Sequence, residues 1–152
     1  MRTQVPEFPP ELCADSHDSL GKRGENFAAW YVTHVMKMHV LGRNLELRVP
    51  LLTRRRQGEL DIIAKDGETL VFIEVRTRDE ISPVYGGPET TVGAEKRFHI
   101  TRAARLWMHQ NGISPNIPVR FDFAAVVWNQ GAPDIKYYFD AFSWEEPRIR
   151  FF

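Results

Sequence analysis

The stretch GELDIIAKDGETLVFIEVRTR, residues 58–78, decides the fold. Two apolar runs flank an Asp-Gly pair, which is the pattern of a strand, a tight turn and a second strand. Charged side chains interrupt both runs, with Asp61 in the first and Glu74 and Arg76 in the second. A sheet built only for packing would exclude these charges. The stretch therefore predicts a hairpin that carries a polar site.

The second strand of this hairpin has two distinct faces, because side chains alternate along a strand. The two faces are Val71, Ile73 and Val75 on one side, and Leu70, Phe72, Glu74 and Arg76 on the other. Both faces begin apolar, which predicts a central strand covered on both sides. Only the far end of one face is polar, and we expect the site at that end.

The position of the turn sets how the two acidic residues face each other. If Asp66-Gly67 forms a two-residue turn, Asp61 lies opposite Phe72 and diagonally from Glu74, roughly 7 Å away on the same face. Two carboxylates at that separation repel when ionised, and a divalent cation between them removes the repulsion. Glu59 shares this face. A slip of one residue would move Asp61 to the other face.

The rest of the chain predicts two helices and three more strands. The predicted elements are a helix over about 20–37 capped by Asp18 or Ser19, a strand over 39–49, the hairpin, a helix from after Thr91 to about 110, a strand over 119–128, a turn over 129–134 and a strand over 135–142. The order predicts an α/β fold with a mixed sheet, in which the strands on either side of the second helix are parallel. We expect a disordered arm over 1–18, one domain over 19–144 and a tail over 145–152.

Each predicted helix carries a charged residue near its N-terminal end. Glu25 lies in line with Ala28 and Val32, and Lys96 lies in line with Ile100. Each charge heads a partly apolar stripe, so both side chains are expected to reach toward the polar end of the sheet.

Composition limits the classes of protein. The 152 residues suggest one domain, and the formal net charge of zero gives no general affinity for nucleic acid. The chain has one cysteine, Cys13, so it has no disulfide framework, which fits a reducing cytosol. No run approaches the ~18 apolar residues of a membrane span. We therefore expect a cytoplasmic location and no membrane partner.

The ordered pieces of the sequence resemble a known family. These pieces are GKRGENFAAWYV, LGRNLELR, GELDIIAKDGETLVFIEVRTR, YGGPETTVGAEKRFHITRAARLWM and VRFDFAAVVW, which together cover about residues 21–128. They resemble the YraN family of endonuclease-like proteins within the PD-(D/E)xK nuclease superfamily. The superfamily motif alone is short and weakly specific, whereas the ordered set is strong.

The resemblance implies a restriction-endonuclease-like core that cleaves DNA with Mg²⁺ or Mn²⁺. Asp61 and Glu74 match the metal ligands of the superfamily, with Glu25 and the backbone carbonyl of Val75 assisting. Arg76 stands at the position of the motif lysine. Arginine effectively cannot lose its proton, although it can still orient a phosphate. Lys96 is the residue expected to supply an ammonium group.

Several arginines are candidates for gripping the phosphates of DNA. They are Arg54, Arg55 and Arg56 before the first strand of the hairpin, Arg78 at the end of the second strand and Arg97 on the second helix. For each charged residue the alternative is a solvated surface position, and for Asp61 and Glu74 it is an ion pair with Arg76. Asp122, two residues after Arg120, is expected to form a structural pair.

Three hypotheses for the function follow. The first is a metal-dependent DNA endonuclease acting in repair or recombination, on branched or damaged DNA. The second is a nuclease-fold module that has lost activity and binds such DNA. The third is a protein-interaction scaffold that docks through the aromatic C-terminus. The sequence leaves the oligomeric state open, with a dimer among the options.

Overall fold

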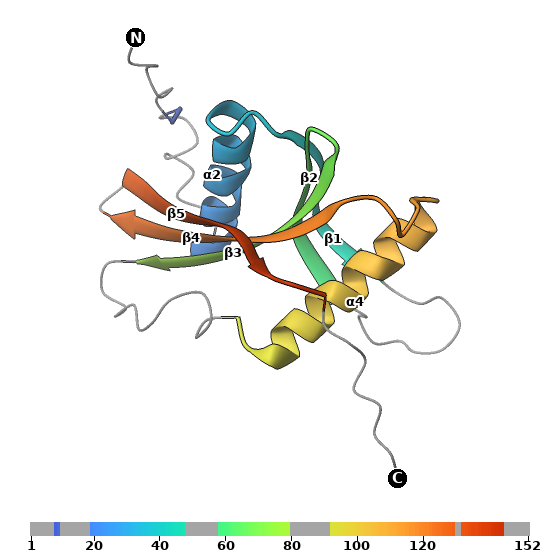
Figure 1. Cartoon of the computed structure of the whole chain (residues 1–152). Coiled ribbons are helices and arrows are strands. Elements are labelled where there is room, and N and C mark those ends of the chain that lie inside the picture. The colour runs from blue at the N-terminus through green and yellow to red at the C-terminus, as the bar shows by residue number, and fades with distance from the viewer. Residues whose placement is uncertain (1–7, 10–18, 48–57, 80–91, 130–131, 145–152) are drawn as a thin grey trace.

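A five-stranded sheet with one helix against each face forms the body of the protein (Figure 1). The computed structural model describes residues 8–9, 19–47, 58–79, 92–129 and 132–144. The elements are α2 (Leu20–His34), β1 (His39–Leu47), β2 (Gly58–Asp66), β3 (Thr69–Asp79), α4 (Ala94–Gln110), β4 (Val119–Asn129) and β5 (Ala132–Phe142). The predicted order and the α/β class with a mixed sheet are confirmed.

The strands lie side by side in chain order, β1-β2-β3-β4-β5. Every neighbouring pair is antiparallel except β3 and β4, which are parallel. A parallel pair needs a long crossover connection, and α4 lies within that connection. The parallel pairing predicted around the second helix is thus confirmed, and β3 is the central strand.

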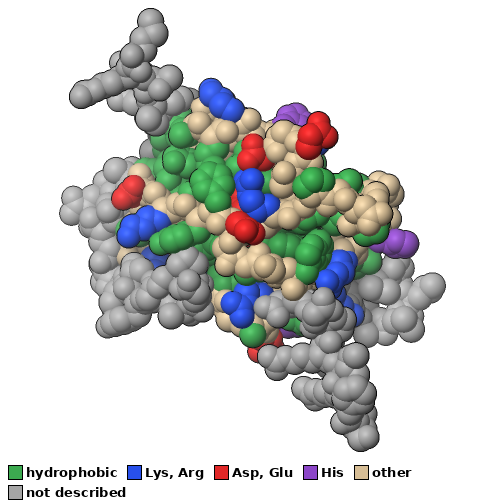
Figure 2. Space-filling model, in the orientation of Figure 1, with side chains coloured by type: hydrophobic (Ala, Val, Ile, Leu, Met, Phe, Trp, Pro, Cys, Tyr) green, Lys and Arg blue, Asp and Glu red, His purple; other side chains and the backbone are tan. Residues whose placement is uncertain are grey.

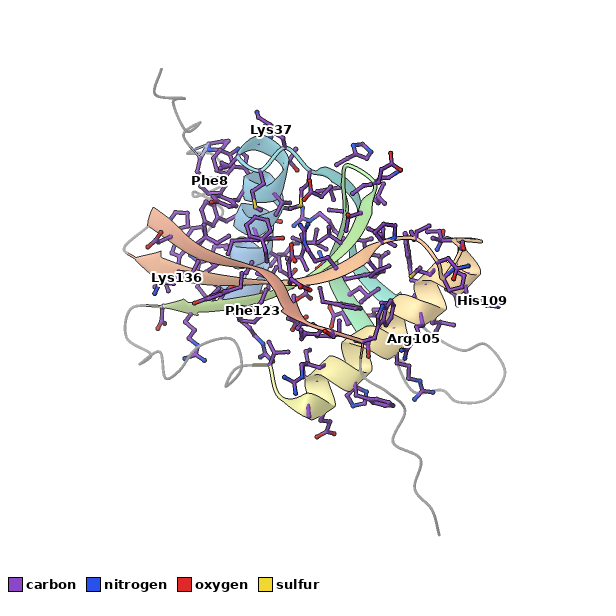
Figure 3. All side chains as sticks on the ribbon, viewed as in Figure 1. Phe8, Lys37, Arg105, His109, Phe123 and Lys136 are labelled. Atoms are coloured by element: carbon purple, nitrogen blue, oxygen red, sulfur yellow. The ribbon has the colours of Figure 1, made fainter. Side chains whose placement is uncertain are left out.

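Two apolar clusters separate the faces of the sheet. Val71, Ile73 and Val75 pack on the α2 side, whereas Leu70 and Phe72 pack on the α4 side. The alternation predicted for β3 is therefore confirmed. Phe123, labelled in Figure 3, belongs to the α4-side cluster and is 2% exposed. Because both faces of β3 are covered, any polar group near its middle is withdrawn from solvent.

The turn of the central hairpin lies one residue later than predicted. Asp66 pairs with Thr69, so the two turn residues are Gly67 and Glu68. Gly67 has a φ of 59°, and it occupies the first central position, where type II′ turns take glycine. The predicted pairing of Asp61 with Phe72 was wrong, because Phe72 pairs with Ile63. The pairing is offset by two residues, which preserves the faces of the paired side chains from Ile62 to Asp66.

Two further element boundaries differ from the prediction. The first helix ends at His34 instead of near Lys37, because Lys37 takes a left-handed φ of 61° and the Met38 N–H donates to the Val32 carbonyl. The turn predicted over 129–134 was too long, since β4 runs to Asn129 and β5 begins at Ala132. An edge strand tolerates Pro133, which had indicated a turn.

The start of α2 follows the predicted capping. The Ser19 side chain accepts a hydrogen bond from the Lys22 N–H at 3.2 Å, as expected for an N-cap residue. From the predicted arm, Phe8 packs edge-on against Phe27 and Trp30 beside α2 (Figure 3). The rest of that arm and the predicted C-terminal tail lie outside the described residues.

The surface and the helices agree with the balanced composition. On the face shown in Figure 2, acidic and basic side chains are interspersed among apolar ones. Among the helices in the described part of the chain, none is long and apolar enough to cross a membrane.

Candidate active site

The polar site lies where β2 and β3 stop pairing. Their paired residues end at Ile62 and Ile73, and Asp61 and Glu74 follow at the next position on each strand. The Asp61 carboxylate accepts a hydrogen bond from the Val75 N–H at 2.9 Å. Asp61 is 9% exposed and Glu74 is 5% exposed. The two acidic residues are therefore cross-strand neighbours at the end of the paired region.

The backbone of β2 is irregular at Asp61. Leu60 packs in the α4-side cluster and Ile62 packs in the α2-side cluster, although two residues apart on a regular strand would share a face. On β1, Asn44 lies between the partners of Leu60 and Ile62 and has a left-handed φ of 50°. Because alternation breaks at Asp61, this side chain lies outside the regular apolar pattern of β2.

Among the described residues, Glu74 contacts two cations, and its carboxyl group is hydrogen-bonded to Asp61. Its Oε1 lies 3.3 Å from the Lys96 ammonium nitrogen and 3.7 Å from Nε of Arg76. Burial, and then the charge of Asp61, raise the pKa of Glu74 to about 8, although Lys96 and Arg76 act in the opposite direction. The two cations therefore only partly offset the burial of this carboxyl group and its closeness to Asp61.

The two cations reach Glu74 from different elements. Arg76 follows it by two residues on β3, and Lys96 extends from the first turn of α4. The Arg76 side chain is 47% exposed and the Lys96 side chain 42% exposed. Each of these two side chains therefore extends from the buried carboxyl group into the solvent, where a phosphate could approach. The structure brings Asp61, Glu74, Arg76 and Lys96 together.

Glu25 approaches the same end of the sheet from α2. Burial, and then the charges of Asp61 and Glu59, raise its pKa to about 7. Its position depends on the preceding residue, because a Cβ atom at Gly24 would overlap the Thr77 side chain on β3. Sequence analysis missed Gly24, and a glycine within an amphipathic helix was the signal that could have revealed it.

Two acids form the centre of the site, and Glu25 lies within electrostatic range of Asp61. The described residues contain no group of three or more His, Cys, Asp or Glu side chains close enough to hold a metal ion. A pair is still a suitable donor set, because Mg²⁺ is usually bound by one or two carboxylates together with water. The crowding that raises the pKa of Glu74 is also what a divalent cation would relieve.

The predicted phosphate-gripping arginines are only partly described. Arg54, Arg55 and Arg56 lie outside the described residues. Arg78 is partly buried two residues beyond Arg76, and Arg97 is partly buried next to Lys96. These two therefore lie close in sequence to the cations that contact Glu74.

A second buried carboxylate lies on β4 and is fully bonded. Asp122 is 0% exposed, and Nε and Nη2 of Arg120 donate to its two oxygens at 2.9 and 3.0 Å. The Tyr137 hydroxyl donates at 2.6 Å and the Asp140 N–H at 2.8 Å. Burial, and then the charge of Asp122, raise the pKa of Tyr137. The structural pairing predicted for Asp122 is confirmed.

Arg120 also reaches the hairpin turn. Its Nη1 donates to the Asp66 carboxylate at 3.0 Å. The hydrogen bonds to Asp122 are the main cause of the raised pKa of Arg120. One guanidinium thus joins β4 to the end of β2 that is farthest from Asp61.

Comparison with known proteins agrees with this architecture. The model described as "Uncharacterised protein family UPF0102" matches residues 24–126, which contain all the residues that form the site. The chain belongs to the UPF0102 family. A UPF0102 protein of Anaeromyxobacter dehalogenans is 37% identical over 128 residues, which cover 84% of this chain and 87% of the relative.

Other UPF0102 relatives show a similar likeness. One from Geobacter sulfurreducens is 37% identical over 124 residues, covering 81% of this chain and 88% of its own. The UPF0102 protein YraN of Salmonella newport is 41% identical over 91 residues, covering 59% of this chain and 65% of its own. The family predicted from the ordered motifs is confirmed.

Proposed function

We propose that this UPF0102 protein is a DNA endonuclease that hydrolyses phosphodiester bonds with Mg²⁺ or Mn²⁺. The observation that carries the proposal is the pair of crowded carboxyl groups, Asp61 and Glu74, with Lys96 and Arg76 beside them at one end of the sheet. The resemblance of the motif spacing to the PD-(D/E)xK superfamily supports the same reaction. A role in DNA repair or recombination in the cytoplasm follows as part of the proposal.

Asp61 and Glu74 would hold the metal, with the Val75 carbonyl and Glu25 assisting. When bound, a divalent cation lowers the pKa of a water molecule and neutralises charge on the phosphate. The hydrogen bond from the Val75 N–H fixes one oxygen of Asp61. The carboxylate is thereby oriented before any ligand arrives, and its remaining lone pairs are directed away from the backbone.

Lys96 and Arg76 would act on the phosphate. Both contact Glu74 now, and both are nearly half exposed. A cation that is shared between a carboxylate and a phosphate positions the scissile group and stabilises the charge that develops on it. Arg76 offers a planar, bidentate grip, and Lys96 offers a compact charge.

A second candidate function is DNA binding without cleavage. Arg76 favours it, because arginine at the position of the motif lysine cannot give up its proton to assist catalysis. The absence of a third acidic ligand in the described cluster favours it as well. In this case Asp61 and Glu74 would serve the fold, and the arginines would grip phosphates. Metal binding separates the two candidates.

The test combines metal titration with a cleavage assay. Calorimetry of the purified protein with Mg²⁺ and Mn²⁺ should show binding that Asp61→Asn abolishes. Cleavage of linear, nicked and branched DNA should be lost in the same variant. The matched control is Asp134→Asn, an exposed position on β5, which should retain both properties.

The outcomes distinguish the candidates. Cleavage that survives Asp61→Asn would overturn the nuclease proposal. DNA binding without metal binding or cleavage would establish the second candidate. In either case the DNA affinity should fall as salt rises from about 50 to about 200 mM, with a log–log slope of about −0.9 for each phosphate contact. Binding that is insensitive to salt would contradict contact through the arginines.

A further inference from the structure

A groove lies between α2 and β1, beside the candidate active site. Its volume is about 370 Å³, and its lining includes Asn26, Trp30, Thr33 and His34 from α2 and Arg43 from β1. Small-molecule sites typically occupy about 300–1,000 Å³. The groove therefore has room for a small planar group, and it combines aromatic, amide and cationic side chains.

Packing holds the Trp30 ring of the groove in place, whereas His34 beside it is exposed. The ring centroids of Trp30 and His34 lie 5.8 Å apart. Trp30 is stacked on Phe27 at 6.0 Å and meets Phe8 edge-on at 5.3 Å. Because these contacts already fix the Trp30 ring, it loses little entropy when a flat ligand stacks on it.

The polar end of the groove is formed by a side-chain pair. Nη2 of Arg43 donates to the Asn26 Oδ1 at 2.7 Å. A guanidinium carries five N–H donors and an amide carries two. Arg43 can therefore hold Asn26 and an anionic oxygen at once, while the Asn26 amide can donate to a base edge.

The groove continues from the carboxylate site. Arg43 pairs with Ile62, the residue after Asp61. Arg43 also donates to Asn26, the residue after Glu25. The same cation thus faces both the groove and the acidic site, so a strand entering one is guided toward the other.

We propose that the α2–β1 groove binds an unpaired nucleotide of the DNA strand that enters the active site, with the base against Trp30 and His34 and a phosphate on Arg43. This inference rests on the proposed function and names its substrate class as DNA with a single-stranded segment next to a duplex. In a blunt duplex the faces of the bases are stacked on one another. Only an unpaired base can present its face to the wall.

The first test compares two DNAs in the Asp61→Asn background, where cleavage does not interfere. One is a blunt duplex and the other is the same duplex with an unpaired flap, each labelled for fluorescence anisotropy at fixed salt. Stacking of one base on an aromatic ring corresponds to about 5- to 150-fold in Kd. We expect the flapped DNA to bind at least fivefold more tightly, and equal affinities would overturn the inference.

The second test fills the groove. Thr33 is exposed and lies on the groove side of α2, so Thr33→Trp should occupy the space with little effect on the core. The ratio of the two affinities should fall to about one. The matched control is Gln110→Trp, which adds the same ring at an exposed position on the other helix and should keep the ratio. An unchanged ratio in Thr33→Trp would overturn the inference.

The third test needs no variant. A flap carrying 5-iodouracil should crosslink on irradiation to a peptide that contains Trp30 or His34, and crosslinks only to other peptides would overturn the inference. Failure of the inference is distinguishable from failure of the proposed function. A native protein that cuts blunt and flapped DNA equally, with loss of both activities in Asp61→Asn, would keep the nuclease and remove the groove.

Discussion

Two buried carboxyl groups on adjacent strands show opposite environments. Asp122 on β4 receives two hydrogen bonds from Arg120, one from Tyr137 and one from the Asp140 backbone. Glu74 on β3 has two cations at 3.3 and 3.7 Å and a neighbouring acid, Asp61. Asp122 is fully bonded within the protein, whereas Glu74 is buried at a cost that its neighbours only partly offset.

The difference distinguishes a carboxylate that serves the structure from one that could bind a cation. Each carboxylate oxygen offers about two lone-pair directions, and the bonds to Asp122 fill them from the protein itself. Glu74 sits beside a second acid, whose charge raises its pKa, so a cation would be more strongly bound there. Burial alone would have ranked Asp122 as the stronger candidate, and the hydrogen-bond partners reverse that order.

The largest effect on stability is expected from a substitution of Asp122, the fully bonded carboxylate. Asp122→Asn removes the ionised partner that accepts two of the three Arg120 hydrogen bonds given above, and losing one partner of a buried pair costs about 3–5 kcal/mol. The free energy of unfolding, measured by urea denaturation, should fall by about 3 kcal/mol. Glu68→Gln, in the exposed turn, serves as the control. A loss below about 1 kcal/mol would contradict a structural role for Asp122.

A smaller loss is expected from Tyr137→Phe. The variant keeps the ring and removes one hydrogen bond to a charged group, which is worth about 1.5–3 kcal/mol. Urea denaturation should show a loss of about 2 kcal/mol. Combined with Asp122→Asn, the loss should be less than the sum of the two, because both changes act on one network. Strict additivity would show that the two residues are not coupled.

Glu74, the other carboxyl group of this comparison, should make the stability of the protein depend on pH. The pKa of Glu74 is about 8 in the folded protein, against 4.5 for an unperturbed glutamate. Between these values the folded state binds more protons than the unfolded state, so stability is highest near the lower value and falls as pH rises.

Without divalent metal, we expect the free energy of unfolding to fall steadily from pH 5 to pH 8, measured by denaturation at each pH. Glu74→Gln stays neutral and should flatten this profile, leaving the contribution of Glu25, which has the same sign. A native profile that rises over this range would be inconsistent with a crowded Glu74.

The smallest effect is expected from Arg76→Lys. Lysine can lose its proton when it is desolvated and can approach an attacking water as a compact group. General acid–base assistance is worth about 10²- to 10⁴-fold at best, and we expect about a tenfold faster cleavage at saturating DNA, or about 1.4 kcal/mol. Arg102→Lys on the exposed face of α4 is the control.

Rate and affinity should be measured separately for Arg76→Lys, because a bidentate grip on phosphate is lost. If the variant binds metal and DNA and cuts no faster than the native chain, the missing lysine does not limit the rate. Lys96→Ala then becomes the next variant to measure.

Much of this arrangement was predictable because it depends on periodicity. The alternation of β3 predicted both its covered faces and the side on which Glu74 and Arg76 lie. Asp61 was assigned to the correct end of the sheet although its partner was wrong. A two-residue error in register keeps the paired side chains from Ile62 to Asp66 on their faces, whereas Leu60 lies on the face opposite to the one that regular alternation predicts.

The remaining features depend on contacts that no local pattern encodes. The break in alternation between Leu60 and Ile62 depends on packing against two different helices. The close approach of Gly24 to Thr77 joins residues from α2 and β3. The pair formed by Arg43 and Asn26 likewise joins distant segments. Each requires the three-dimensional placement of elements that sequence analysis could only order.

The bond between Arg120 and Asp66 has a consequence for the opposite end of the hairpin. A slip of β2 by two residues would preserve both apolar faces, so packing alone discriminates poorly against it. Such a slip would move Asp66 by roughly 7 Å along the strand, beyond the reach of a guanidinium that is already fastened to Asp122. Arg120 therefore fixes the register of β2 against β3. It excludes the misaligned hairpin at the turn, and so sets which residue faces Glu74 at the far end.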